Sequence, residues 1–254
     1  MKDAKREILA RVAAGTLTAE EAAVELGELD YTRHAQEPVA TATASDVTRV
    51  RVVTNMGSVT VIGDESVREA AADGPHIARR EGETIVIESD EDQNGIGFTF
   101  GGGRGRFGLD FKDWKLVVRM NPHLQLDAEV QAGSLTISGI HAPIHAEVQA
   151  GSTRIEDFTF PIDLDCQAGS VKARGRLTEG SSRISCQAGS VKLSLDPGSS
   201  VKVKAKTSLG RISLPGQPTV AGISGGHTEA QVGAGEATLE IESELGSVQV
   251  SVDG

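Results

Sequence analysis

Aromatic residues are scarce in this chain of 254 residues: six Phe, one Tyr and one Trp make up 3% of it, whereas Gly occurs 30 times. A chain of this length can bury a substantial core. With so few aromatics, Val, Ile, Leu and Ala must fill that core. These side chains fill a thin cross-section, which is typical of narrow repeat structures.

Cysteine and basic charge are also in short supply. Cys166 and Cys186 are too few for a disulfide framework or a structural zinc site. We expect reduced thiols that pack as small hydrophobic residues. The 25 Lys and Arg are outnumbered by 36 Asp and Glu, which gives a net charge of -11. This charge repels polyphosphate backbones and anionic lipid, so we expect no nucleic-acid partner.

Long hydrophobic runs are missing too. No run approaches the roughly 18 apolar residues that a membrane span requires. The opening residues "MKDAKREILARV" have neither the apolar core nor the cleavage site of a secretion signal. The simplest expectation is a soluble cytoplasmic protein, with recruitment to a membrane by a partner left open.

The first residues have helical patterns. The apolar residues of 4–14 share one helical face before Gly15, and Thr18 with Glu21 forms a capping box for a second short helix. Residues 1–27 are therefore predicted to be a two-helix module, and 28–46 a linker. Helices this short are marginal alone. Their apolar side chains must pack on the body or on another copy: Ile8, Leu9, Val12 and Leu26.

The body, residues 47–254, is repetitive. The tetrapeptide Gln-Ala-Gly-Ser occurs four times, beginning at Gln131, Gln149, Gln167 and Gln187, at spacings of 18, 18 and 20 residues. Alternating apolar residues precede and follow each copy, so each glycine is predicted to form a corner between two strands. Degenerate copies complete the set of predicted corners: Gly57, Gly133, Gly151, Gly169, Gly189, Gly210 and Gly246.

A fixed period predicts a mainly β chain folded as a single-stranded β-solenoid (β-helix) with coils of about 18–20 residues. In this interpretation the Ala of each tetrapeptide faces the core, and Gln and Ser form ladders. An antiparallel sandwich or barrel also has short alternating strands, but it does not explain the recurring tetrapeptide. The final strand, "GSVQVSVDG", is predicted to be an uncapped end of the solenoid.

A Gly-rich insertion at about 89–114 interrupts the repeat. It contains five of the eight aromatic residues, and aromatics with Arg dominate interface hot spots. The insertion is therefore a candidate interface, with a plain cap or lid over the coil end as the alternative. The candidate contact residues are Phe98, Phe100, Arg104, Arg106, Phe107, Phe111 and Trp114.

Motifs for metals and cofactors are incomplete. "DEDQNG" at 90–95 resembles half of a calcium loop, but Gly101 stands where the bidentate Glu is needed. "GGGRGRFG" at 101–108 lacks the ending of a phosphate-binding loop. His141 and His145 flank Pro143 with no third ligand nearby, which favours a surface corner. We expect no metal and no cofactor.

Catalytic motifs are missing as well: there is no nucleophile elbow and no zinc-protease motif. Carboxylates such as Glu129, Glu147, Asp163 and Asp165 alternate with apolar residues, as the outward side of strands should. No catalytic residue is predicted, and a polysaccharide-active enzyme ranks third among the possible functions.

The strand-Gly-strand units, and "VVRMNPHLQLDAEVQAGSLTISGI" in particular, resemble the bacterial putative-adhesin β-strand-repeat family, also called toastrack-like. "KREILARVAAGTLTAEEAAVEL" is similar to the SHOCT-like helical module that often precedes that body. The resemblance implies a noncatalytic scaffold or interaction module, linked in some members to cell-envelope stress responses. The sequence departs from the adhesin label because no export signal is evident.

The expected function is a structural protein that self-associates through its helical head, its coil ends or both. A second hypothesis is a regulatory module that uses residues 90–114 to bind a protein or another ligand. The expected partners are other copies of the chain and, through the resemblance, a membrane-associated regulatory protein.

Overall fold

The computed structural model describes residues 46–90, 115–222 and 226–253, and all regular structure within them is β. The predicted helical module and almost all of the predicted linker lie outside the described residues. Residues 45–254 form one compact unit. The described part of this unit is mainly β and solenoid-like, as the repeat predicts.

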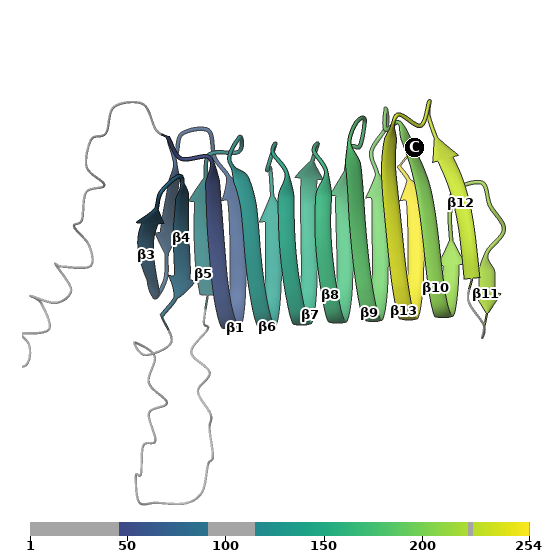
Figure 1. Cartoon of the computed structure of the whole chain (residues 1–254), viewed down its shortest axis with the longest axis horizontal. Helices are drawn as coiled ribbons and strands as arrows, with labels where there is room; N and C mark the ends of the chain where they lie inside the picture. Colours follow the sequence, from purple (N-terminus) through teal and green to yellow (C-terminus); the bar gives the residue numbers. More distant parts are fainter. Residues whose placement is uncertain (1–45, 91–114, 223–225, 254) are drawn as a thin grey trace, which may run out of the picture. The chain divides into compact units, whose positions relative to one another are not determined.

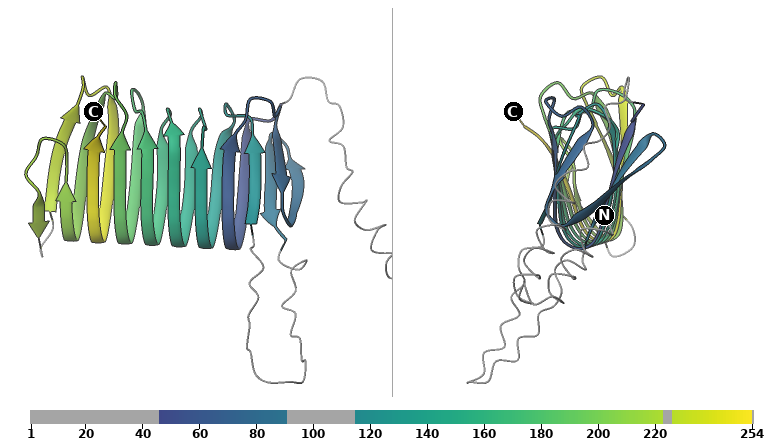
Figure 2. Two further views of the ribbon diagram at one scale, coloured as in Figure 1. Left: turned by 180° about the vertical axis from the view of Figure 1, so that it is seen from behind. Right: turned by 90° about the vertical axis from the view of Figure 1, so that its left-hand side faces the viewer.

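The repeating unit is one long strand bent in the middle. Four consecutive units are β6 (Gln125–Ser138), β7 (Ile144–Phe158), β8 (Ile162–Gly175) and β9 (Ser181–Leu195). Each pairs with the next in parallel and in register. The halves before the bends form a first wall and the halves after them a second wall, and the two walls meet along the edge drawn lowest in Figures 1 and 2. This parallel pairing excludes a sandwich of hairpins for these coils.

The core lies between the walls. Along β6, Leu126, Ala128 and Val130 are buried before the bend, and Leu135 and Ile137 after it. Each later coil repeats this pattern, so the core is a stack of aliphatic layers. Phe158 is the largest fully buried side chain among the described residues. The thin aliphatic interior matches the shortage of aromatics in the sequence.

The alanines of the tetrapeptides do not fill the core, contrary to the sequence prediction. Ala132 is half-buried, and Ala150 and Ala168 are exposed. Leu209, which the alternation also places inside, is 44% exposed. The inside-outside alternation of a strand holds only while the strand is straight. At the bend, successive residues both lie on the outer side of the corner.

The glycines stand at these bends and form one ladder. Gly57, Gly133, Gly151, Gly169 and Gly189 pair in order, and Gly246 and Gly210 continue the series. All seven have positive φ, between 115° and 154°. A Cβ on Gly133 would lie 1.8 Å from the carbonyl oxygen of Gly57. The corner therefore needs glycine for its backbone conformation and for the close approach of the neighbouring coil.

The first strands of the chain form one end of the solenoid. β1 (Arg49–Gly63) pairs with β6 on one side and with two short strands on the other. These are β4 (Thr84–Ser89) in the first wall and β5 (Lys115–Met120) in the second, which together make one coil. In the sequence, residues 91–114 stand between these two halves, where the other coils have their corner glycine. Beyond this coil, β3 (His76–Glu81) and β2 (Ala70–Asp73) pair antiparallel to β4 and β5.

The other end corrects the prediction of an open C-terminal strand. β13 (Ala237–Val252) lies between β9 and β10 (Val201–Ser213), paired in parallel with both. The last strand is thus interior, as Figure 1 shows. β12 (Gly226–Val232) and β11 (Val220–Gly222) pair antiparallel to the two halves of β10. Antiparallel strands therefore cover both ends, and neither end presents a free coil of the repeat.

Candidate functional site

The first wall carries a surface that we call the acidic face: Asp127, Glu129, Glu147, Asp163 and Asp165. Strand alternation points these side chains outward from β6, β7 and β8. Their register stacks Glu129 beside Glu147 and Glu147 beside Asp165. Neighbouring strands are about 4.8 Å apart, and like charges directly opposite one another destabilise a sheet.

The chain compensates only part of this charge. Nη2 of Arg51 on β1 donates to Glu129 Oε2 at 3.0 Å, and Nε of Arg51 lies 3.9 Å from Asp127 Oδ2. The hydrogen bond to Glu129 and the charge of Asp127 raise the pKa of the Arg51 guanidinium. Asp165 has no cation within 4.0 Å among the residues described.

His145 lies inside the acidic face. Its Nδ1 is 3.3 Å from Asp163 Oδ2, and its Nε2 is 3.5 Å from Glu147 Oε1. In register it stands between Asp127 and Asp163. The searched part of the chain contains no group of three His, Cys, Asp or Glu side chains arranged to hold a metal ion.

A shallow groove of about 240 Å³ borders the acidic face at its upper edge. Arg49 Nη2 donates to Gln125 Oε1 there at 3.1 Å. The groove is open to solvent, so it offers little enclosure to a small ligand. Its lining consists of Arg49, Gln125, Leu126, Asp127, Pro143, Ile144, His145, Pro161 and Asp163.

The second wall carries the opposite charge. Arg154 on β7, Lys172 on β8 and Lys192 on β9 are exposed and adjacent in register, and we call them the basic row. Arg154 Nη1 donates to Glu156 Oε1 at 3.2 Å. Within the described ranges, Lys172 and Lys192 have no carboxylate within 4.0 Å. β7 and β8 thus display carboxylates of the acidic face on one wall and cations of the basic row on the other.

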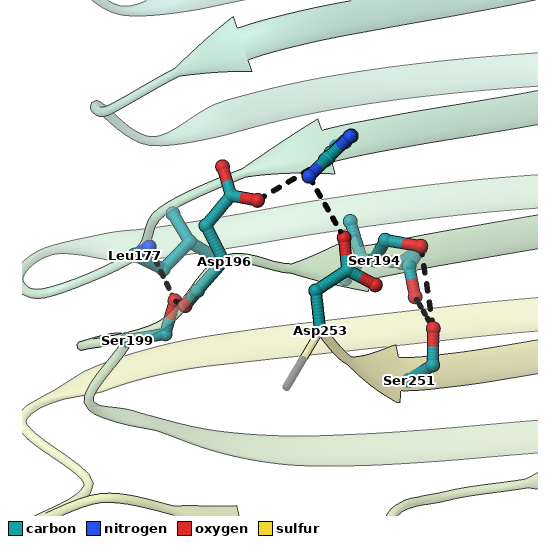
Figure 3. Close-up of polar contacts among 8 residues, drawn as sticks. Leu177, Ser194, Asp196, Ser199, Ser251 and Asp253 are labelled. Atoms are coloured by element: carbon teal, nitrogen blue, oxygen red, sulfur yellow. Dashed lines mark hydrogen bonds and ion pairs between the residues drawn. The ribbon is translucent and has the colours of Figure 1, made fainter.

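Arg174 ties three elements together at the upper edge of the second wall. Its Nε donates to Asp196 Oδ1 at 3.1 Å, and its Nη2 lies 3.1 Å from Asp253 Oδ2. Figure 3 labels Asp196 and Asp253 and marks these two contacts with dashed lines. Hydrogen bonding to Asp196 and the charge of Asp253 raise the pKa of the Arg174 guanidinium. The cluster fastens the end of β13 across β9 to β8.

Cys166 and Cys186 are buried neighbours on β8 and β9, and neither forms a disulfide. Contact with Cys186, together with burial, raises the pKa of the Cys166 thiol. The hydrogen bond with Cys166 lowers the pKa of the Cys186 thiol, although burial opposes this shift. Both side chains lie inside the core, so a reagent in solvent cannot reach either sulfur while the protein is folded.

Both thiols should therefore resist alkylation in the folded protein. At neutral pH we expect iodoacetamide to modify them at least about a hundredfold more slowly than in guanidinium chloride, because reaction requires opening of the core. Mass spectrometry of time points would measure the two rates, with the unfolded protein as the positive control. Rapid modification of native Cys186 would contradict the assignment.

Of the candidate residues chosen from the sequence, the structure describes the corner glycines but not the two sets of candidate contacts. The insertion contacts, Phe98 to Trp114, and the helical-head contacts, Ile8 to Leu26, lie outside the described residues. His141 packs near His123, with ring centroids 6.2 Å apart. The basic row was missed, although its signal is present in the repeats. In "AEVQAGSTRI" an acidic residue precedes the glycine and a basic residue follows it.

The architecture defines a parallel β-solenoid with an acidic face on one wall and a basic row on the other. The chain belongs to the Toastrack DUF4097 family, whose model matches residues 27–251. Within residues 46–90, 115–222 and 226–253 there is no helix that is long and apolar enough to cross a membrane.

Two solved structures are similar to the chain. One is a putative cell adhesion protein from Clostridium sporogenes, with 15% identity over 84% of this chain and 96% of that one, at a TM-score of 0.40. The other is a putative adhesin from Bacteroides fragilis, with 8% identity over 80% and 92% of the two chains, at a TM-score of 0.23. No match was found among curated proteins. Both TM-scores are below 0.5, so neither structure carries a functional argument.

Proposed function

We propose that the protein is a noncatalytic scaffold that self-associates through its solenoid body. The observation that carries this proposal is the pair of like-charged rows on the two walls, which the chain compensates only in part: Asp165, Lys172 and Lys192 have no oppositely charged group within 4.0 Å among the described residues. Such rows cost free energy in a single copy. Contact with a surface of opposite charge recovers it.

An enzymatic role has less support from the geometry. Glycosidases place two carboxylates on opposite sides of a bound sugar. Asp127 and Asp163 border the shallow groove, but His145 occupies the position between them. The remaining carboxylates lie on an open wall rather than in a cleft.

A second candidate function is recognition of a partner through residues 90–114. The specific observation is that β4 and β5 are halves of one coil, so the insertion occupies a single corner. Through the family resemblance, a membrane-associated regulator of the envelope stress response is the partner we propose for it. This role would place the protein inside the cell, near the membrane.

A variant that shortens the connection between β4 and β5 would separate the two proposed functions. Ser89 lies beside Thr54, with their hydroxyl oxygens 2.8 Å apart, and Lys115 pairs with Ser58. In β1 three residues, Asn55, Met56 and Gly57, join these positions. Replacing residues 90–114 with Gln-Ala-Gly should therefore restore an ordinary corner without changing the register.

Sedimentation velocity over a range of concentrations tests the proposal. We expect the full chain to show a mass that rises with concentration, and the shortened variant to behave in the same way. A full chain that stays monomeric at millimolar concentration would reject self-association. Association that disappears only in the shortened variant would assign the contact to the insertion instead.

A further inference from the structure

We infer that copies of the protein stack wall to wall, with the acidic face of one copy against the basic row of the next. This inference rests on the proposed self-association and names the surfaces that make it. The occupant of each wall is thus a second copy of this chain, chosen by complementary charge rather than by an apolar patch.

The two surfaces have matching periods. In the acidic face, Glu129, Glu147 and Asp165 place one charge on each of three successive coils. The basic row does the same on β7, β8 and β9. The period of both is therefore the strand spacing, about 4.8 Å. With a second copy shifted by one coil along the solenoid, three pairs of opposite charge form together: Arg154 with Glu129, Lys172 with Glu147, and Lys192 with Asp165.

The two surfaces also lie at matching heights. Glu147 is four residues before the corner at Gly151, and Arg154 is three residues after it. At about 3.3 Å per residue, the rows differ in height above the corner edge by only about 3 Å. Long Lys and Arg side chains span such a difference. The remaining carboxylate of the acidic face that has no Arg partner, Asp163, lies next to this contact on β8.

The contact has a consequence for assembly. Because the acidic face and the basic row are on opposite walls of one copy, their association is heterologous. A two-fold dimer would instead place carboxylates against carboxylates. Each added copy leaves one acidic face and one basic row free, so the stack has no built-in stopping point.

Salt should act in two directions. The net charge of -11 makes distant copies repel one another at low ionic strength. At about 0.15 M salt the Debye length is about 8 Å, so this repulsion is screened while charges in contact still attract. Near 1 M the length falls to about 3 Å and the contact pairs weaken. We expect association to be strongest at intermediate salt.

Charge reversal on each wall tests the inference directly. The variant Lys172→Glu/Lys192→Glu replaces two cations of the basic row with carboxylates, and Glu147→Lys/Asp165→Lys replaces two carboxylates of the acidic face with cations. Each variant alone should self-associate at least about tenfold more weakly, because exposed pairs contribute modest amounts individually. An equimolar mixture should recover association to within about threefold of the unmodified protein, since the two variants complement each other.

Sedimentation velocity at several salt concentrations provides the measurement. The control Arg176→Glu/Lys202→Glu makes the same change in net charge outside the basic row, and it should associate like the unmodified chain. The substituted side chains are exposed, and circular dichroism would verify folding. The salt optimum of the unmodified chain is a second test that needs no variant.

The outcomes are separable. If the unmodified chain associates but the mixture is no stronger than the variants, wall-to-wall stacking is wrong and the scaffold proposal stands. Loss of association in only one variant would also overturn it, because some other segment would then occupy that wall. If the unmodified chain never associates, both proposals fail.

Discussion

Replacing Gly169 with alanine should destabilise the protein by at least about 4 kcal/mol, which is a large part of the stability of an ordinary domain. Gly169 has a φ of +150°, and an added Cβ would lie 1.8 Å from the carbonyl oxygen of Gly151. The oxygen belongs to the backbone of the neighbouring coil, and the Cβ is fixed directly to the backbone of Gly169, so neither atom can rotate away. Relief would require separating β7 from β8 at the corner, which breaks the ladder on both walls.

Gly216→Ala is the matched control. Gly216 also has positive φ, +68°, but no heavy atom lies within 4 Å of an added Cβ. It should lose only about 1 kcal/mol, through backbone strain alone. Urea denaturation and soluble yield would compare the two. Similar midpoints for both variants would show that the corners do not need glycine for close approach.

Removing residues 237–254 should unfold strands that precede the cut. β13 connects β9 to β10, and β10 pairs otherwise only with β11 and β12 among the described strands. Without β13, residues 201–232 lose their sheet partner. Buried side chains such as Leu239 and Ile241 are also lost from the core, at about 2–5 kcal/mol each. We expect rapid amide exchange and proteolysis throughout 201–232.

Hydrogen exchange with mass spectrometry would resolve this by segment, with β6 to β8 as the internal reference. The control Asp253→Asn removes one exposed ion-pair partner of Arg174 and leaves β13 in place, so protection of 201–232 should barely change. If 201–232 stays protected in the truncated chain, β13 does not bridge β9 and β10.

The coil itself is predictable from the sequence because its cause is local. Glycine at a fixed period, between segments that alternate in polarity, specifies two straight halves and one bend. The orientation of residues within the bend is not predictable in this way. Counting every second residue through Gly133 wrongly places Ala132 in the core, since the alternation stops where the strand turns.

The order of the coils is the part that sequence reasoning misses. β10 and β13 carry the same inward pattern and the same corner glycine, so either could stand beside β9. The choice depends on long-range pairing that no local pattern encodes. For the same reason, residues 84–89 and 115–120 resemble independent strands, although they are halves of one coil.

The charged walls can be predicted from the sequence only in part. Alternation predicts that Glu147 and Arg154 both face outward, and the structure agrees. Their separation onto opposite walls follows only after the corner at Gly151 is known to fold the strand back. Because the strand bends at the glycine, the acidic residue before it and the basic residue after it lie on different walls.

The interior position of β13 also has a consequence for synthesis. During translation β10, β11 and β12 emerge before the strand that must lie between them and β9. Until residues 237–252 leave the ribosome, the nascent chain keeps a vacant strand position with two unpaired edges. An incomplete chain is therefore open to invasion by the equivalent strand of a neighbouring nascent chain, a route to domain-swapped misassembly.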